Sequence, residues 1–209
     1  SRENLASDMA VGFKGNPNVG SIVLNQFADS YAFTQFAQSF NQGDRIFIIS
    51  SIFGGTGASG FPLLLKNLRD FGEDRPNSKL IRTAPIGAIT VLPYFNVTAP
   101  ADGGEINSST FISKAKAALS YYDKNVTRNG QSALNAMYYI GDNLRDQYEY
   151  SVGGEGQNNA AHFVELASAM AIVDFANLNN DDAVLNVDGE DYYAPNATFR
   201  EFGINEDAN

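Results

Sequence analysis

Residues 45–62, RIFIISSIFGGTGASGFP, decide the fold, because an apolar run gives way there to a glycine-rich stretch. Arg45–Phe53 is short, nearly all apolar and rich in Ile and Phe, which is typical of a strand buried on both faces of a parallel sheet. The glycines of Gly54–Gly60 follow, and a helix is then predicted over Phe61–Phe71, with Pro62 in its first turn. The pattern therefore predicts a strand, a glycine loop and a helix in direct succession.

The predicted glycine loop has the chemistry of an anion-binding site. Glycine permits positive φ and lets backbone N–H groups approach an anion closely. The helix that follows adds N–H donors without intrahelical partners and a partial positive charge. Thr56 and Ser59 supply hydroxyl groups, and the carboxyl end of a strand is where α/β sheets bind ligands. We predict that Gly54–Gly60 cradles phosphate; the alternative is a tight turn that binds nothing.

The rest of the chain alternates strands and helices. Further buried strands are predicted at Pro85–Tyr94 and Ala133–Ile140, and a short strand at Ala183–Val187. Helices are predicted at Ser21–Asn41, Ser109–Asp123 and Asn158–Leu178, the last apolar nearly all round and therefore expected to be a long buried central helix. This order predicts one α/β domain over residues 1–209, a parallel Rossmann-like sheet with helices on both faces.

Composition narrows the classes of function. The net charge is −10, with 24 acidic against 14 basic residues, so we expect no nucleic-acid partner. No apolar run reaches the roughly 18 residues of a membrane span. Ser1–Ala10 lacks the basic start and apolar core of a signal peptide, and the chain has no cysteine, so we expect a cytoplasmic protein. The single histidine, His162, has no serine-triad context.

The glycine stretch leaves two nucleotide-binding families open. It lacks Gly-Lys-Ser/Thr and is therefore no P-loop. Some dinucleotide-binding Rossmann proteins carry Gly-x-Thr-Gly-x-x-Gly, whereas Gly-Gly-Thr-Gly is the signature of the tubulin/FtsZ family, which Gly54–Gly57 resembles. The order of further motifs favours the second family. The motifs are Gly15–Gly20 (GNPNVG), similar to Gly-Asn-Pro-x-x-Gly; Val91–Phe95, similar to a strand ending in Lys-Pro-Phe; Gly141–Leu144, similar to Asn-Asp-x-Leu; the apolar helix Asn158–Leu178; and Asn186–Asp191 (NVDGED), similar to Asn-x-Asp-x-x-Asp.

The resemblance implies a GTP/GDP site with Mg²⁺ and a role for each matching residue. Gly54, Gly55, Thr56, Gly57, Ala58, Ser59 and Gly60 would hold the β- and γ-phosphates, and Gly15 and Asn16 would close over the γ-phosphate. Asp142 and Asn143 would lie near the ribose or base, and Asn158, Asn159 and His162 near the base. Asp188 and Asp191 would polarise the attacking water at the nucleotide of the next subunit, in a head-to-tail assembly. No side chain is assigned as a metal ligand.

Departures from the family keep alternatives open. Its second signature glycine falls on Ser59, with Gly60 one place late. Its first strands, their glycine-rich phosphate loop and its C-terminal domain have no counterpart, so we expect a fragment or a reduced relative, and GTPase activity only if the site is complete. A Rossmann-type NAD(P)-binding protein is one alternative, although the strand ending Pro93-Tyr94-Phe95 lacks the charged residue that would hold a ribose. A non-catalytic scaffold of the same fold is the other.

Overall fold

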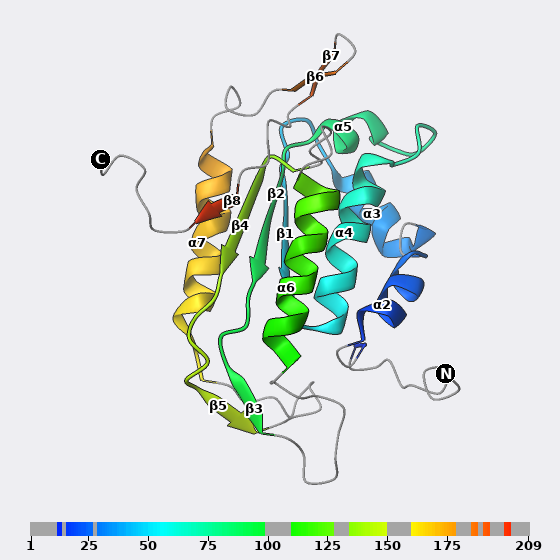
Figure 1. Cartoon of the computed structure of the whole chain (residues 1–209). Helices are drawn as coiled ribbons and strands as arrows, with labels where there is room; N and C mark the ends of the chain where they lie inside the picture. Colours follow the sequence, from blue (N-terminus) through cyan, green and yellow to red (C-terminus); the bar gives the residue numbers. More distant parts are fainter. Residues whose placement is uncertain are drawn as a thin grey trace.

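A parallel sheet forms the centre of the molecule. The computed structural model of the chain describes residues 12–13, 16–26, 29–98, 110–127, 134–149, 160–178, 185–187, 190–192 and 199–201. The strands β1 (Ile46–Ser51), β2 (Ile86–Val91), β4 (Ala136–Ile140) and β8 (Phe199–Glu201) pair in the order β1-β2-β4-β8, all parallel (Figure 1). The predicted α/β class with a parallel sheet is confirmed, and β1, β2 and β4 lie inside the predicted strands.

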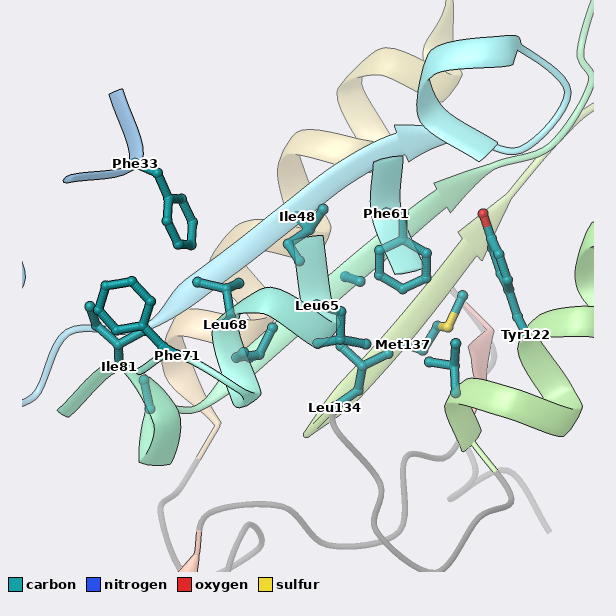
Figure 2. Close-up of a cluster of buried hydrophobic side chains, with 14 of the residues drawn as sticks. Phe33, Ile48, Phe61, Leu65, Leu68, Phe71, Ile81, Tyr122, Leu134 and Met137 are labelled. Carbon is teal, nitrogen blue, oxygen red and sulfur yellow. The ribbon is translucent and has the colours of Figure 1, made fainter. Parts of the chain in front are cut away.

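Helices cover both faces of the sheet. The helices α4 (Gly55–Arg69) and α6 (Phe111–Tyr122) lie on one face, and α7 (Phe163–Asn177) lies on the other (Figure 1). Because side chains alternate along a strand, Ile48 and Met137 join the α4–α6 core (Figure 2), whereas Ile89 and Tyr138 pack with α7. Ile86 belongs to the α4–α6 core as well. The predicted helices on both faces are therefore confirmed.

One glycine lets α7 approach the sheet closely. A Cβ atom on Gly87, in β2, would lie 2.8 Å from atoms of the Phe175 ring and 2.8 Å from the Phe47 ring. Those two rings are in contact, with centroids 5.5 Å apart. A side chain at position 87 would push α7 away from the strands, so glycine sets the spacing of this layer.

Shorter elements complete the described chain. They are α2 (Pro17–Leu24), α3 (Tyr31–Ser39), α5 (Ser78–Thr83), a π-helical turn (Asp123–Thr127), the parallel pair β3 (Asn96–Thr98) and β5 (Gln147–Glu149), and the antiparallel pair β6 (Leu185–Val187) and β7 (Glu190–Tyr192). β6 falls inside the strand predicted at Ala183–Val187. No described helix combines the length and apolarity that crossing a bilayer requires.

The helix predicted over Ser21–Asn41 is wrong in one respect, because it is two helices. α2 ends at Leu24, and α3 starts afresh after Ser30, whose hydroxyl oxygen accepts a hydrogen bond from the N–H of Phe33 (3.2 Å). Serine is a strong N-cap, so it begins a helix more readily than it continues one. The apolar residues of this region are thus shared between two helix faces.

The prediction that Arg45–Phe53 is buried on both faces is also wrong. β1 is the end strand of the described sheet, and Ile49 is 55% exposed. α7 lies mainly over β2 and β4, so it leaves this part of β1 uncovered. The strand is nevertheless parallel to β2 over its whole length, from Ile46 opposite Ile86 to Ser51 opposite Val91.

The predicted central helix is buried on one side only. α7 begins at Phe163, and residues 158 and 159 lie outside the described part of the chain. Val164, Ala171 and Phe175 are buried against the sheet, whereas Leu166 is 66% exposed and Val173 60% exposed. An all-round apolar sequence predicts burial, but one sheet face covers only one side of a helix.

Candidate functional site

Three helices begin at the same edge of the sheet. β1, β2 and β4 run in one direction, and α4, α6 and α7 each follow one of these strands, so their N-termini gather at the carboxyl edge (Figure 1). The described residues that the sequence assigned to a nucleotide belong to this edge or to the first turns of α4, except Asn16, which caps α2, and Asp191, which lies in β7. The edge is therefore the candidate site.

The predicted glycine loop is a helix from its second residue. Gly54 is the N-cap of α4, with φ −86° and ψ 171°, and Gly55 is the first helical residue. Among the described glycines only Gly12 and Gly43 have positive φ, so the loop expected over Gly54–Gly60 is wrong. The helix predicted to start at Phe61 starts six positions earlier, and Pro62 lies in the helix interior instead of the first turn.

Close packing explains most of these glycines. A Cβ atom on Gly57 would lie 2.4 Å from the carbonyl oxygen of Ser51, so this glycine lets α4 lie directly on the backbone of β1. A Cβ atom on Gly60 would lie 3.1 Å from the Leu24 side chain of α2. From the α2 side, a Cβ atom on Gly20 would lie 2.2 Å from the Ser59 hydroxyl. Helix packing requires these glycines, a role that the local sequence pattern does not reveal.

The first turn of α4 has no side-chain cap, and Gly55 within it is buried. The N-cap Gly54 has no side chain, so it offers no acceptor to the N-terminal N–H groups of the helix. Thr56 is exposed, and its hydroxyl oxygen accepts a hydrogen bond from the N–H of Phe13 at 3.4 Å. Ser59 is buried, and its hydroxyl donates to the carbonyl oxygen of Gly55 at 2.7 Å. Of the two hydroxyls, only that of Thr56 therefore lies at the surface.

The segment before α2 lies against this turn. A Cβ atom on Gly12 would lie 2.9 Å from the Thr56 hydroxyl oxygen. Asn16 is the N-cap of α2, and its side-chain oxygen accepts a hydrogen bond from the N–H of Val19 at 3.5 Å. Gly15 lies outside the described residues. The N–H of Asn16 donates to the carbonyl oxygen of Phe13 at 2.8 Å, and the N–H of Phe13 donates to Thr56, so Asn16 lies near the start of α4.

A second group forms at the ends of β4 and α7. His162 is the N-cap of α7, and its Nδ1 accepts a hydrogen bond from the N–H of Val164 at 3.2 Å. This assigns the proton of the neutral ring to Nε2, which lies 3.7 Å from Oδ2 of Asp142 and 3.7 Å from Oδ2 of Asp146. Asn143 N–H donates to Oδ1 of Asp142 at 2.7 Å. The predicted residues Asp142, Asn143 and His162 therefore lie together.

Sequence reasoning missed two members of this group. Asp146 follows Asp142 by four residues and belongs to none of the motifs found in the sequence. The ring of Tyr94 lies 4.8 Å from that of His162, and burial raises the pKa of Tyr94, with smaller contributions from Glu165 and Tyr148. A tyrosine at the end of a predicted strand was the only available signal. The group combines carboxylates, an imidazole and a phenol.

A pocket of about 680 Å³ opens beside Asp142 and Asn143. Its wall comes from α6, from the ends of β2 and β4, and from the first residue of α7, and includes Leu92, Lys116, Tyr139 and Phe163. An apolar cavity with a few polar groups at one side is the usual form of a small-molecule site.

A row of aromatic side chains separates this pocket from the first turn of α4. The Phe53 ring lies 5.1 Å from that of Phe111 and 5.8 Å from that of Phe95. The Phe95 ring is 4.9 Å from Tyr94, which in turn contacts His162. The two groups of predicted site residues thus share an edge but lie at opposite ends of the row.

The remaining predicted site residues have no described side chain. Asn158, Asn159 and Asp188 lie outside the described residues, and Asp191 lies in β7, where only the backbone is described. In the part of the chain that the structure covers, no three or more His, Cys, Asp and Glu residues form a metal-binding group. The catalytic roles predicted for Asp188 and Asp191 stay predictions.

Comparison with known proteins gives a distant likeness of fold. No protein-family model and no curated protein matches the chain. Among solved structures, CetZ2 from Haloferax volcanii, in a GTPgS-bound protofilament, is similar over 84% of this chain, with 17% identity and a TM-score of 0.46. The chain covers 42% of the length of that protein. A likeness of this size carries no information on function.

Proposed function

We propose that the chain is a nucleotide-binding protein of the tubulin/FtsZ type, with GTP or GDP as ligand and Mg²⁺ as the accompanying cation. One observation carries the proposal. The first turn of α4 and the group of Asp142, Asn143 and His162 lie on one carboxyl edge of a parallel sheet, where ligands of α/β proteins bind. The motif order in the sequence supplies the nucleotide class.

Each end of this edge suits one part of a nucleotide. Backbone N–H groups of Gly55, Thr56 and Gly57 would donate to phosphate oxygens at the positive end of the α4 dipole. The Asp142 carboxylate would accept hydrogen bonds from N–H groups of a purine in the adjoining pocket, between Tyr139 and Phe163. A Mg²⁺ ion commonly takes phosphate oxygens and water with few protein ligands, and would neutralise charge on the phosphates.

A specific observation favours the second candidate, a non-catalytic scaffold of this fold. The aromatic row Phe53–Phe111–Phe95–Tyr94 lies between the two ends of the proposed site. A nucleotide that spans the edge must lie over these rings or displace them. If they stay in place, the chain keeps the fold and has no nucleotide to turn over.

Direct binding tests the first candidate. Labelled GTP, ATP and NADP are titrated into the purified chain, and we expect GTP to bind most tightly. The site variant is Gly54→Asp. Asp is a good N-cap and stabilises a helix, but it places a negative charge where phosphate is proposed to bind. The new Cβ would lie 3.1 Å from the Ser51 hydroxyl, which a small rotation of that side chain relieves.

The matched control is Ser30→Asp, which adds the same charge at the N-cap of α3. We expect Gly54→Asp to weaken GTP binding at least about tenfold and Ser30→Asp to leave it unchanged. Tightest binding of NADP would replace the proposal with the Rossmann alternative. If none of the three nucleotides binds, the non-catalytic scaffold is the candidate that remains.

Turnover tests the shared site. Head-to-tail contacts are heterologous and produce open filaments, so a site completed by the next subunit is active only in the assembly. We expect phosphate release per chain to rise with protein concentration, and Asp188→Ala to abolish it while GTP binding persists. Release that is strictly proportional to chain concentration would contradict a shared site.

A further inference from the structure

A second pocket lies on the outer side of α4, away from Asp142 and His162. It is a groove of about 600 Å³ between α4, α6 and the start of α2. Its floor is mainly apolar, with Ile52, Pro62, Leu63 and Ala118 among the lining residues. The groove passes the N-cap Gly54 at one end and reaches Lys66, about 18 Å further along α4 at 1.5 Å per residue.

The groove carries positive charge in a strongly acidic protein. Lys66 lines it from α4 and Lys114 from the first turn of α6, and none of the described residues that line it is acidic. The whole chain has a net charge of −10, so two lysines at one apolar cavity run against the average of its surface. Such an arrangement selects anions over cations and neutral molecules.

The lining also has polar and aromatic groups suited to an organic ligand. Tyr121 is 52% exposed and lies beside Tyr122 on the α6 wall, with ring centroids 6.3 Å apart. Ser21 and Asn18 line the α2 side. A lysine ammonium attracts a phosphate or carboxylate as a point charge, and the apolar floor favours a hydrocarbon or aromatic body over inorganic phosphate.

We infer that the groove between α4 and α6 binds an amphipathic organic anion, with an acidic headgroup held by Lys66 and Lys114 and an apolar body on Pro62, Leu63 and Ala118. This site goes beyond the nucleotide proposal and does not depend on it, because it includes neither the pocket beside Asp142 nor the His162 group. It shares Gly54, Ala58 and Ser59 with the start of α4, and Phe53 with the aromatic row.

The test uses phenyl phosphate as the probe and amide NMR spectra of the labelled full chain as the readout. We expect phenyl phosphate to shift the amides of Lys66, Lys114 and Ala118 in a saturable way. Inorganic phosphate and benzyl alcohol, which each lack one half of the probe, should bind several-fold more weakly. Lys66→Gln and Lys114→Gln should each weaken the binding of phenyl phosphate about threefold, as expected for ion pairs that solvent reaches, and the double variant about tenfold.

Two matched controls separate the groove from general surface effects. Lys79→Gln removes the same charge from the exposed face of α5, and binding should not change. Ala117→Phe fills the groove from the exposed side of α6 and should abolish binding, whereas Ala176→Phe on α7 should not. Equal loss in Lys79→Gln, shifts confined to other surfaces, or no saturable shift would overturn the site. GTP titrated into the double variant should bind as in the parent chain, so either proposal can fail alone.

Discussion

At the scale of single residues, Asn77 has the least ordinary backbone. Its φ of 54° and ψ of 22° lie in the left-handed region, which no other described non-glycine residue occupies. Its side-chain Nδ2 donates to the carbonyl oxygens of Ala37 (3.0 Å) and Phe40 (2.9 Å), at the end of α3. Asparagine tolerates this backbone better than most residues and here closes a helix terminus far away in sequence.

We predict that Asn77→Ala lowers the free energy of unfolding by about 2–3 kcal/mol, because it loses both hydrogen bonds and strains the backbone. Asn77→Gly loses the same bonds without the strain and should cost about 1 kcal/mol less than the alanine variant. Urea unfolding of the three proteins measures both differences. Equal costs for alanine and glycine would show that the left-handed backbone contributes nothing.

At the scale of elements, α4 contains a proline that its neighbour compensates. Pro62 has no N–H, so the carbonyl oxygen of Ala58, four residues earlier, lacks its helical donor. The hydroxyl of Tyr122 in α6 donates to that oxygen at 3.2 Å. Tyr122 is 1% exposed and its ring packs edge-on against Phe61, 5.0 Å away. A bond between helices therefore replaces one that α4 cannot make.

Tyr122→Phe should lower the free energy of unfolding by about 1 kcal/mol, because it takes the donor from the partly buried carbonyl of Ala58 and preserves the ring. Tyr121→Phe is the matched control, since Tyr121 is half exposed and is not the residue that donates to Ala58. We expect that control to change stability by less than about 0.5 kcal/mol. The measurement is chemical unfolding at neutral pH, and a similar value for both variants would exclude the compensation.

The same tyrosine predicts a steep loss of stability at high pH. Burial raises the pKa of Tyr122 well above the ordinary value of 10.0, and neighbouring Tyr121 adds to the rise. Between the ordinary pKa and the raised one, the unfolded chain has lost this proton and the folded chain has kept it. Stability is therefore complete below pH 10 and falls as the pH rises further. The free energy of unfolding should fall less steeply above pH 10 in Tyr122→Phe than in the parent chain. Denaturant unfolding curves recorded at a series of pH values measure both slopes, and equal slopes would contradict the role given to Tyr122.

Helix starts show how far sequence can predict an element. The sequence predicts the succession of β1 and α4 correctly, although β1 ends at Ser51, two residues before the predicted end at Phe53. The predicted start of α4, at Phe61, is too late, because glycine and Pro62 both have low helix propensity. The close approach of α4 to β1 at Gly57, and to α2 at Gly60, overrides that preference, and neither partner is visible from the local pattern.

At the scale of the whole molecule, the sequence predicted the elements better than their surroundings. Apolar runs located β1, β2 and β4, and their alternation with helices gave the parallel sheet. The edge position of β1 and the exposed side of α7 depend on which layers exist around them, and no residue pattern encodes that. In the candidate site, motifs brought Asp142 and His162 together, whereas Asp146 and the aromatic row required the folded arrangement of the loops.

One side chain ties the edge strand to the far layer. Arg45, just before β1, donates from Nη1 to the carbonyl oxygen of Phe175 (2.7 Å) and from Nη2 to that of Leu178 (2.8 Å). Its guanidinium lies 5.8 Å from the Phe175 ring centroid. These bonds satisfy the last carbonyls of α7 and place a positive charge at the negative end of that helix. Arg45 therefore anchors the C-terminus of α7 to the start of β1, a strand that α7 scarcely covers.

We predict that Arg45→Met, which keeps an apolar stem but loses both bonds, lowers the free energy of unfolding by about 2–3 kcal/mol, since both bonds involve a charged donor. Arg45→Lys keeps the charge without the fork and should lose less. Arg145→Met, at an exposed position, is the control and should change little. Because the anchor is local, amide hydrogen exchange should accelerate first in the last turn of α7, whereas β2 and β4 should follow the global change. Uniform acceleration through sheet and helix alike would mean that Arg45 stabilises the fold as a whole and does not anchor this layer.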